Sequence, residues 1–268
     1  RDLHLSLRRQ RQMCIRDSIK SFRKVNSPAA GHPEFGELPG IETTTGPLGQ
    51  GLGNGLGMAI SEKIMRQRYG ENVFNHCTYI LAGDGCLMEG ISHEFASLAG
   101  HLNLSNLVLI YDDNKISIDG PTSLTMSDNT LERFNALGWH TTSIDGYNLE
   151  EVDSALTNAK LDPRPSLISC QTLIGYGAPN KQNTAGSHGA PLGEEEIQMA
   201  KKNMKWNYDK FVIPEQVKKD WEEIGSRNIG LSKEWEKQNS HTLNDIKKIN
   251  DELLNNIERG KKKVLIIS

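Results

Sequence analysis

Short apolar runs and amphipathic stretches alternate along most of the chain. Four runs have the length and the apolar or β-branched composition of buried strands: 76–82, 107–113, 139–144 and 165–173. Around them, apolar residues recur near helical spacing over 49–70, 89–102, 130–138 and 148–160. Strands that alternate with helices in this way predict an α/β fold. We expect a doubly wound parallel sheet with helices on both of its faces.

The two ends of the chain differ in composition from the region between them. Residues 1–18 are Arg-rich and lack glycine, and they resemble translated sequencing-adapter read-through, so we interpret them as foreign and assign them no function. Residues 19–230 form the expected α/β domain, in which 176–193 is a long polar loop of the kind that is usually functional. Charged residues follow a helical pattern over 231–258, so residues 231–268 are expected to form a peripheral helix and the start of a linker.

Composition excludes several classes of protein. The net charge is -3, and no basic stripe interleaved with aromatic residues follows the N-terminus, which argues against nucleic-acid binding. No apolar segment approaches the roughly 18 residues that a membrane span requires. The four cysteines, Cys14, Cys77, Cys86 and Cys170, show no CxxC pair and no metal-ligand spacing. We expect Cys77 and Cys170 to be buried reduced thiols, which indicates a cytoplasmic location.

A glycine-dense stretch, 46–57, invites comparison with phosphate-binding loops. A dinucleotide fingerprint fails there, because the last glycine of the motif is missing whether the motif starts at Gly51 or at Gly53, and no strand precedes the stretch. The chain also contains no GxxxxGK[ST] motif. For Gly53, Gly55 and Gly57, close packing of the helix is as good an interpretation as a role in binding phosphate.

A stronger signal is Asp84, which stands between two glycines directly after an apolar run. About thirty residues further on, Asn114 follows the next predicted strand. The carboxyl ends of neighbouring parallel strands meet at one edge of a sheet, where ligands bind in such folds. Two oxygen ligands at that edge suit Mg²⁺, which takes its remaining ligands from phosphate and water. The alternative for each residue is an Asx turn at the end of a strand.

This pattern, GDG followed by Asn, resembles the diphosphate–Mg²⁺ motif of thiamine-diphosphate enzymes. A closer resemblance, to transketolase, runs from about Ile19 to about residue 214. It is carried by "GHPEFGELPGIETTTGPLGQGLGNGLGMAISEK", "GDGCLMEGISHE", "YDDNKISIDG", "GWH" and "IGYGAPNK…SHGAPLG". The resemblance implies transfer of a two-carbon ketol group between sugar phosphates in the pentose phosphate pathway. Thiamine diphosphate would serve as the electron sink, Mg²⁺ as the metal (with Ca²⁺ or Mn²⁺ as substitutes), and a homodimer as the assembly.

The resemblance also assigns the metal and diphosphate contacts. It implies that the side chains of Asp84 and Asn114 and the backbone carbonyl of Ile116 ligate Mg²⁺. The backbone of Gly85 would contact the diphosphate. On this interpretation, a cation makes the aspartate tolerable at the end of a buried strand.

Further residues receive roles in the same way. Gly46, Pro47 and Leu48 match the segment that contacts the aminopyrimidine of the cofactor. His32 matches a histidine near the reacting carbons of the sugar donor, and His188 matches one near the diphosphate and the substrate hydroxyls. Histidines suit proton transfer to and from such hydroxyls near neutral pH.

Glu89 matches a carboxylate at the subunit interface of the family. An equally good interpretation is that its charge simply complements the N-terminus of the following helix. For the two histidines, the alternative is a solvated bystander in a loop. We leave His93, His101 and His140 as structural or surface residues.

The resemblance implies a second, pyrimidine-binding domain and an upstream loop for which this sequence has no counterpart. We therefore interpret the chain as an incomplete fragment of a transketolase, inactive alone. One alternative is the N-terminal subunit of a split transketolase. Another, from a different class, is a non-catalytic Mg²⁺- and diphosphate-binding module. Dihydroxyacetone synthase and other ketolases share these motifs, so the preferred sugars stay open.

Overall fold

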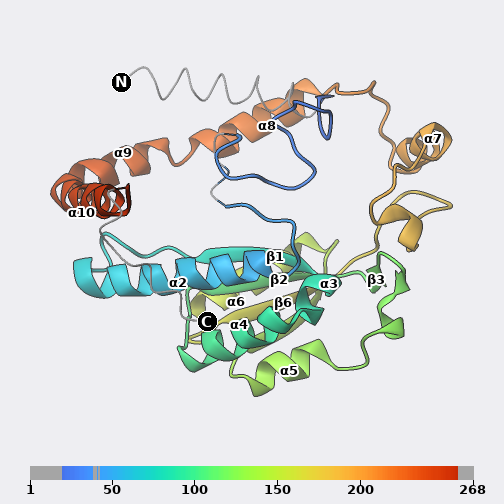
Figure 1. The fold of residues 1–268 in the computed structure, drawn as a ribbon. Coiled ribbons are helices and arrows are strands. Elements are labelled where there is room, and N and C mark those ends of the chain that lie inside the picture. Colours follow the sequence, from blue (N-terminus) through green and yellow to red (C-terminus); the bar gives the residue numbers. More distant parts are fainter. Residues whose placement is uncertain (1–19, 39–40, 42, 259–268) are drawn as a thin grey trace. The chain divides into compact units, whose positions relative to one another are not determined.

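The computed structural model describes residues 20–38, 41 and 43–258, with side chains up to residue 251. It separates into two compact units. Unit 1 comprises Arg1–Ile64 and His76–Val212, and unit 2 comprises Met65–Asn75 and Ile213–Ser268. Unit 1 contains the sheet and the predicted site residues that the structure describes, so the site is built within this unit (Figure 1).

A parallel sheet of four strands forms the centre of unit 1, with the strand order β1-β2-β6-β5. The strands are β1 (Thr78–Gly83), β2 (Leu107–Asp113), β5 (His140–Asp145) and β6 (Ser166–Gln171). In this register Gly83 pairs with Asp112, and Asp113 pairs with Gln171. Residues that follow β1 and β2 therefore emerge at the same edge. The predicted parallel sheet is confirmed.

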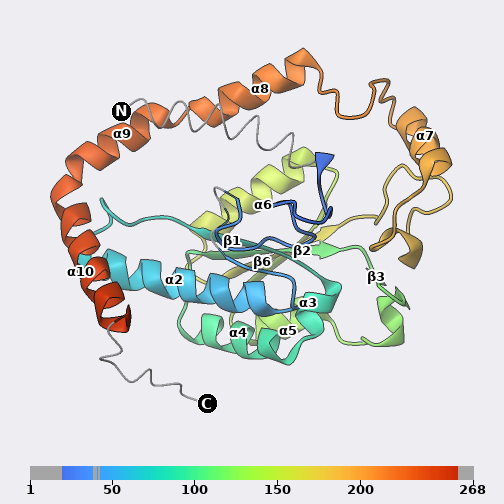
Figure 2. The same ribbon diagram turned by 45° about the horizontal axis from the view of Figure 1, so that its top comes forward.

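Helices cover both faces of this sheet, as predicted. Figure 2 shows α6 on one side of the sheet and α2, α4 and α5 on the other. The helices of unit 1 are α3 (Asp84–Met88), α4 (Gly90–His101), α5 (Thr130–Ala136), α6 (Leu149–Leu161) and α7 (Glu194–Asn203). Helix α2 (Gln50–Tyr69) begins in unit 1 and continues into unit 2.

The alternation of side chains along β2 divides the core between the two faces. Leu107, Leu109 and Tyr111 pack into a cluster that contains aromatic residues of α4 and α5. Val108 lies on the other face, with Ala155 and the rest of a smaller cluster against α6. This is the two-residue period expected of a strand that is covered on both sides.

Local signals set several helix ends. Asn148 caps α6 by accepting hydrogen bonds from the backbone N–H groups of Glu150 and Glu151. Helix α2 stops before Gly70, which has φ +91°. Of the glycines within α2, Gly55 serves close packing, because a Cβ there would lie 2.3 Å from Cδ1 of Ile80.

Short elements complete unit 1, and three helices follow in unit 2. The short elements are β3 (Ile116–Ser117), β4 (Gly120–Pro121) and two 3-10 turns, η1 (Thr122–Leu124) and η2 (Ala185–Ser187). Unit 2 contains α8 (Glu215–Ser226), α9 (Ile229–Gln238) and α10 (Ser240–Glu258). The helical pattern at 231–258 is thus interrupted at Asn239. None of the described helices is long and apolar enough to cross a membrane.

The structure differs from the expected burial at a few positions. Cys77 and Cys170 are half-buried rather than buried, and both are free thiols, as is Cys86. Gly53 and Gly57 have open space where a Cβ would stand, so close packing accounts for Gly55 alone among the three. Cys14 lies outside the described residues.

Candidate cofactor and metal site

The carboxyl edge of the sheet gathers acidic side chains from two adjacent strands. Asp84 is the first residue of α3 and follows β1 directly. Asp112 and Asp113 close β2, the neighbouring strand. Both Asp84 and Asp113 are buried, with exposed fractions of 3% and 7%. The predicted meeting of the two strand ends at one edge is therefore present.

The two carboxylate oxygens of Asp84 differ in their partners. Oδ1 accepts a hydrogen bond from the hydroxyl of Tyr111, a buried residue of β2. Oδ2 is buried and has no hydrogen-bond partner among the described residues. Burial raises the pKa of Asp84, and the nearby charge of Asp113 raises it further, whereas the Tyr111 hydrogen bond and Lys115 act in the opposite direction.

Tyr111 is held as a neutral donor by the same surroundings. Burial is the main cause that raises the pKa of Tyr111, followed by its hydrogen bond to Asp84 and the charges of Asp84 and Asp113. Its ring belongs to the larger core cluster, so packing fixes the direction of the hydroxyl.

Asp113 has one hydrogen-bonded oxygen, Oδ2, whereas its Oδ1 is buried without a hydrogen-bond partner among the described residues and contacts a lysine ammonium instead. The hydroxyl of Ser169 on β6 donates to Oδ2 at 2.9 Å. The ammonium of Lys115 lies 2.6 Å from Oδ1 in an ion pair. Asp112 is also paired, because its Oδ1 accepts from the hydroxyl of Thr172 and its Oδ2 accepts from the amide of Asn114 at 3.1 Å.

Asn114 forms the Asx turn that was the alternative to a ligand role. Its Oδ1 accepts a hydrogen bond from the backbone N–H of Ile116 at 3.0 Å, across Lys115, which has φ +63°. This turn leads into β3, which packs near α3, the helix that begins with Asp84. Asp84 forms no such turn, because its side chain reaches across to β2 instead.

The glycine-rich loop before α2 lies against the start of α3. A Cβ at Gly85 would stand 3.2 Å from Cδ1 of Leu48, so these two predicted cofactor residues are in contact. The next residue, Gly49, has φ +80°, and a Cβ there would lie 3.2 Å from Cβ of Glu89. Leu48 and Glu89 themselves are exposed, as is Pro47. The structure thus brings this loop, Gly85 and Glu89 together.

His32 joins the same group of loops through Gly46. Gly46 has φ +140°, and a Cβ there would lie 3.2 Å from Cγ of the His32 ring. Both facts require glycine at this position. The two loops are also linked by a hydrogen bond from the backbone N–H of Thr45 to the carbonyl of Pro33, at 3.2 Å. His32 is exposed.

His188 lies in the second polar loop, at the end of η2, and is exposed. Its backbone N–H donates to the carbonyl of Ala185, and in the described part of the chain it forms no hydrogen bond or ion pair with Asp84 or Asn114. The loop is anchored by Glu196 of α7, which accepts from the backbone N–H groups of Asn180 and Lys181 at 2.7 and 3.0 Å. The side-chain amide of Asn180 also donates to Glu196, at 2.9 Å, and this hydrogen bond is the main cause that lowers the pKa of Glu196.

Three residues of this edge escaped the sequence reasoning: Tyr111, Ser169 and Thr172. Each is a hydroxyl residue in or just after a strand, and each donates to an aspartate of a neighbouring strand end. The available signal was a polar group inside an apolar run, such as Tyr111 in "LVLIYDD". Only the pairing register shows which aspartate each hydroxyl meets.

The donor set at this edge limits how a metal ion can bind. Within the described part of the chain, no three or more His, Cys, Asp or Glu residues are grouped so that they could hold a metal. A cation would therefore need amide, carbonyl or external oxygens besides Asp84. The buried, unpartnered Oδ2 of Asp84 fits such a cation, because a positive charge would repay the cost of its burial.

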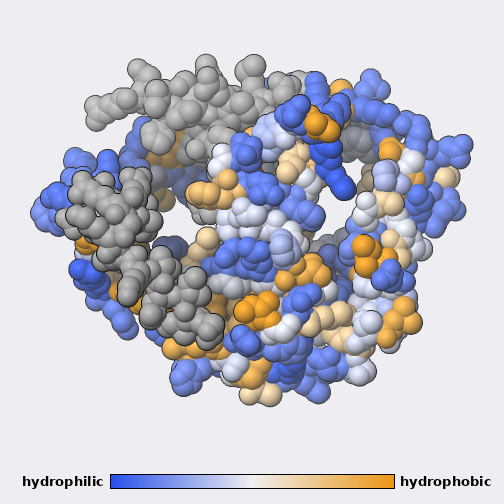
Figure 3. All heavy atoms as spheres, in the orientation of Figure 1, coloured by the Kyte–Doolittle hydropathy of each residue, from blue (hydrophilic) through white to orange (hydrophobic). Residues whose placement is uncertain are grey.

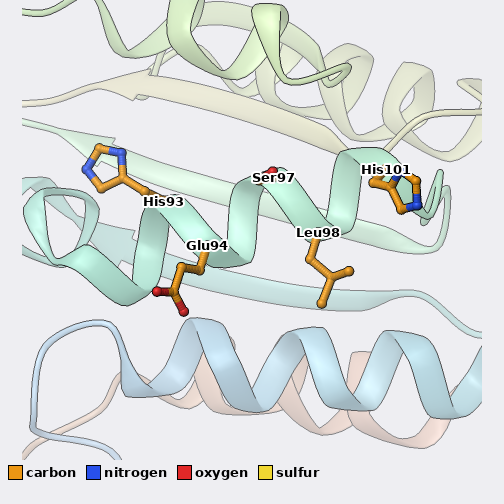
Figure 4. Close-up of a pocket in the computed structure, with 5 residues that line it drawn as sticks. All are labelled: His93, Glu94, Ser97, Leu98 and His101. Carbon is orange, nitrogen blue, oxygen red and sulfur yellow. The ribbon is translucent and has the colours of Figure 1, made fainter. Parts of the chain in front are cut away.

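A separate pocket lies on α4 and is lined by His93, Glu94, Ser97, Leu98 and His101 (Figure 4). All five residues come from one helix, and in Figure 4 Glu94 and Leu98 point to the side opposite to His93. Nε2 of His93 lies 3.1 Å from Nη1 of the Arg133 guanidinium. The pocket contains none of the predicted site residues, so we place the site at the sheet edge.

The fold and the site together define a class of protein. Open parallel α/β sheets bind ligands at the carboxyl ends of their strands, where this chain has glycine turns and a half-paired buried carboxylate, so its class is that of ligand-binding α/β domains. The chain belongs to the family described as "Transketolase, thiamine diphosphate binding domain", whose model matches residues 10–262. This range overlaps the last part of residues 1–18, so their foreign origin stays a prediction.

Curated relatives and solved structures agree with this family. The chain is 51% identical over 226 residues to the transketolase of Buchnera aphidicola, covering 82% of this chain and 34% of that protein. It is 47% identical over 220 residues to that of Cereibacter sphaeroides, with the same coverage. The crystal structure of Campylobacter jejuni transketolase matches with a TM-score of 0.82 and 39% identity, over 85% of this chain and 37% of that one. The chain therefore spans about a third of the relatives that it matches.

Proposed function

We propose that this chain provides the cofactor-binding half of a transketolase site, which holds thiamine diphosphate together with Mg²⁺. The observation that carries the proposal is the buried Oδ2 of Asp84, which has no hydrogen-bond partner among the described residues although burial raises the pKa of Asp84 and the charges of Asp113 and Asp112 are close enough to raise it further. Family membership supports the cofactor. The cation is supported by the chemistry of the donor set, since a carboxylate, an amide and a carbonyl oxygen suit Mg²⁺.

In this proposal, Asp84, Asn114 and the carbonyl of Ile116 hold the cation, and Ca²⁺ or Mn²⁺ can replace Mg²⁺. To bind the cation, the Asn114 side chain gives up its hydrogen bond to the N–H of Ile116 or shares that oxygen. The backbone at Gly85 approaches the diphosphate, because no side chain stands there. Thiamine diphosphate supplies the electron sink for breaking and forming the carbon–carbon bond.

The loop residues bind and orient the cofactor and the sugar. Gly46, Pro47 and Leu48 contact the aminopyrimidine, and the packing of Leu48 on Gly85 supports this placement. His32 and His188 move protons at the sugar hydroxyls, a role that suits an imidazole near neutral pH. The exposure of both rings supports access to a ligand.

The reaction itself is proposed for the whole protein: transfer of a two-carbon ketol group from a ketose phosphate to an aldose phosphate in the pentose phosphate pathway. A related structure, Pichia stipitis transketolase, which is 35% identical, is a complex with sedoheptulose 7-phosphate. Because this chain spans about a third of its relatives, we propose that the 268 residues alone are catalytically inactive.

Dimerisation and a cytoplasmic location complete the proposal. Exposed apolar residues on the helices support a homodimer. Figure 3 shows orange patches of hydrophobic residues among polar ones on one face. On α4 they include Ile91 and Leu98, close in sequence to Glu89, which we propose lies at the subunit interface. The half-buried free thiols support a reducing compartment.

The test is a calorimetric titration of thiamine diphosphate into the 268-residue chain, with and without Mg²⁺. We expect Mg²⁺-dependent binding that Asp84→Asn weakens at least about 100-fold, which corresponds to about 2.7 kcal/mol. Asp162→Asn is the matched control, because it makes the same change at a carboxylate paired with Arg164 on another turn. Binding that does not depend on Mg²⁺, or that survives in Asp84→Asn, would contradict the proposed site.

A second experiment tests whether the rest of the protein is required for ketol transfer. The remaining two thirds of a related transketolase are added in trans to the same chain, and ketol transfer is measured. Activity that appears only on addition supports the proposal, whereas activity of the chain alone contradicts it. Cofactor binding with no activity in either mixture would favour a non-catalytic binding module.

A further inference from the structure

Glu196 of α7 holds the polar loop 176–193 at Asn180 and Lys181. The residue is buried, with an exposed fraction of 6%. Its Oε1 accepts from the backbone N–H groups of Asn180 and Lys181 at 2.7 and 3.0 Å, and its Oε2 accepts from the side-chain amide of Asn180 at 2.9 Å. Hydrogen bonds to an ionised acceptor are about twice as strong as those between neutral groups. One carboxylate therefore attaches this part of the loop firmly to a helix.

Lys181 extends this attachment to the turn that precedes His188. The carbonyl of Lys181 accepts hydrogen bonds from the hydroxyls of Thr184 and Ser187. Thr184 is the N-cap of η2, Ser187 is the last residue of η2, and His188 follows directly. Both ends of the turn are thus bound to a residue whose own N–H is held by Glu196.

On its other side, the turn contacts the segment that leaves the sheet. Gly175 has φ +65°, and a Cβ there would lie 2.6 Å from Oγ of Ser187. The backbone N–H of Asn183 donates to the carbonyl of Ile174 at 2.8 Å. Ile174 and Gly175 follow β6, whose carboxyl end belongs to the candidate site. The turn before His188 is therefore held between this segment and α7.

We propose that Glu196 is a positioning residue, which through this loop sets where His188 meets the diphosphate and the sugar hydroxyls. The inference rests on the proposed function, in which His188 has that role. Glu196 itself contacts neither cofactor nor sugar. Its effect arises because a displacement of about 1 Å at a ligand-binding group can cost about 100-fold in function.

The same helix offers a matched control, Glu194. This carboxylate pairs with Lys210 at 2.8 Å and accepts from Gln198 at 3.1 Å, and both partners lie outside the loop 176–193. Glu194→Gln and Glu196→Gln make the same chemical change two positions apart on α7. The change at Glu196 places an amide N–H₂ group against the N–H donors of the loop, whereas the change at Glu194 leaves the hydrogen bonds of the loop in place.

The experiment is a double-substitution cycle on the binding of thiamine diphosphate to the whole chain, with Mg²⁺ in excess. Dissociation constants are measured by calorimetry for the unaltered chain, Glu196→Gln, His188→Ala and the variant that carries both changes, and circular dichroism verifies the fold. We expect Glu196→Gln and His188→Ala each to raise the constant about 5-fold. With both changes the constant stays at the His188→Ala value, because Glu196 acts through that side chain. Glu194→Gln leaves the constant unchanged.

The outcomes separate this inference from the proposed function. If the unaltered chain binds cofactor and Glu196→Gln binds it equally well, the inference fails and the proposed site stands. If the two effects multiply in the combined variant, Glu196 does not act through His188, and the inference fails as well. If His188→Ala leaves the constant unchanged, the role proposed for His188 and the inference fail together, while the metal site stands. If the unaltered chain shows no Mg²⁺-dependent binding, the proposed function fails, and the inference fails with it.

A spectroscopic measurement tests the position of His188 independently of affinity. The ring nitrogens of isotope-labelled histidine are followed by NMR as each chain is brought to saturation with cofactor, and His188→Ala assigns the signals. We expect the His188 signals to move equally in the unaltered chain and in Glu194→Gln, and less in Glu196→Gln at the same saturation. Equal movement in all three chains would overturn the inference, since the ring would then meet the cofactor in the same place without Glu196.

A further variant applies even if Glu196→Gln does not fold. Thr184→Val together with Ser187→Ala removes both hydroxyls from the carbonyl of Lys181 and leaves the contacts of Glu196 in place. We expect the dissociation constant of thiamine diphosphate to rise, with no further effect of this pair of changes when His188→Ala is also present. An unchanged constant would overturn the inference.

Discussion

Two buried aspartates at adjacent strand ends, Asp84 and Asp113, have nearly the same burial and different surroundings. Asp113 receives a hydroxyl of β6 on one oxygen and a lysine ammonium on the other. Asp84 receives one hydroxyl, from Tyr111, and its second oxygen has no partner among the described residues. In the protein alone, Oδ1 of Asp113 also accepts no hydrogen bond, but the Lys115 ammonium pairs its charge, whereas Oδ2 of Asp84 has neither kind of partner among the described residues.

The difference separates a structural carboxylate from one that is prepared for a ligand. An unpaired buried charge destabilises the fold, and a protein retains such a group where it serves function. The raised pKa of Asp84 reflects this cost, because burial disfavours its charged form. We therefore expect opposite effects on stability when each aspartate loses its charge.

The largest effect on stability is expected from Asp113→Ala. The substitution leaves the buried Ser169 hydroxyl without its acceptor and removes the ion pair with Lys115, whose exposed side chain can be solvated instead. We expect the free energy of unfolding to fall by about 2 kcal/mol, measured by urea denaturation of the cation-free chain. An unchanged free energy of unfolding would show that the pairing of Asp113 is not what stabilises this edge.

An increase in the free energy of unfolding, opposite to the effect of Asp113→Ala, is expected for Asp84→Asn in the absence of cation and cofactor. The amide keeps an acceptor for Tyr111 and removes a buried negative charge close to Asp113. We expect the free energy of unfolding at pH 7 to rise by about 1 kcal/mol, as is common when a functional residue is replaced. The same urea denaturation measures it, with Mg²⁺ removed by a chelator.

The pH dependence of the stability gained in Asp84→Asn tests whether removal of a buried charge is the cause of that gain. Because the folded-state pKa of Asp84 is raised, the folded chain takes up a proton that the unfolded chain does not, and the destabilisation by Asp84 is relieved as the pH falls. The advantage of Asp84→Asn over the unaltered chain should therefore be largest at neutral pH and shrink in acid. A difference that is constant with pH would exclude relief of buried charge as the cause.

The smallest effect is expected at Asp162, a carboxylate that is paired but close to solvent. Its pKa is lowered to about 2, first by its hydrogen bond to Arg164, and the two side chains are 17% and 41% exposed. This pair contributes stability above the unfolded-state pKa of Asp162 and loses it as the pH falls toward 2. We expect Asp162→Asn to cost about 0.5 kcal/mol at pH 7, and less at high salt, by thermal unfolding.

Asp162 shows what pairing contributes at a carboxylate that is less buried than Asp113. A cost at Asp162 as large as the cost at Asp113 would mean that burial adds nothing to the value of a paired carboxylate. The comparison between Asp84 and Asp113 would then need another explanation.

Local patterns predicted much of the fold. The strand at 107–113 has the expected bounds, and the helix expected at 148–160 is α6, Leu149–Leu161. These elements depend on side-chain period and on caps such as Asn148, which act within a few residues. The meeting of Asp84 with the end of β2 was also predictable, because consecutive parallel strands here are neighbours.

The helical pattern at 231–258 shows where local reasoning reached its limit. It divides into α9 and α10 at Asn239, although the sequence there contains neither proline nor glycine. Likewise, the roles of Gly53, Gly55 and Gly57 are indistinguishable by composition. Only the approach of β1 to one side of α2 shows that Gly55 is the one in close contact.

The order and type of the elements of unit 1, the parallel sheet, and the placement of Asp84 and Asn114 after neighbouring strands follow from the amino-acid sequence. The groups that surround these two residues depend on the tertiary structure. Insertion of β6 between β2 and β5 brings Ser169 to Asp113, and the β1–β2 register brings Tyr111 to Asp84. Helix and strand periods arise from neighbours along the chain. The side chain that meets a buried carboxylate comes from another strand, so it depends on the strand order and register of the sheet.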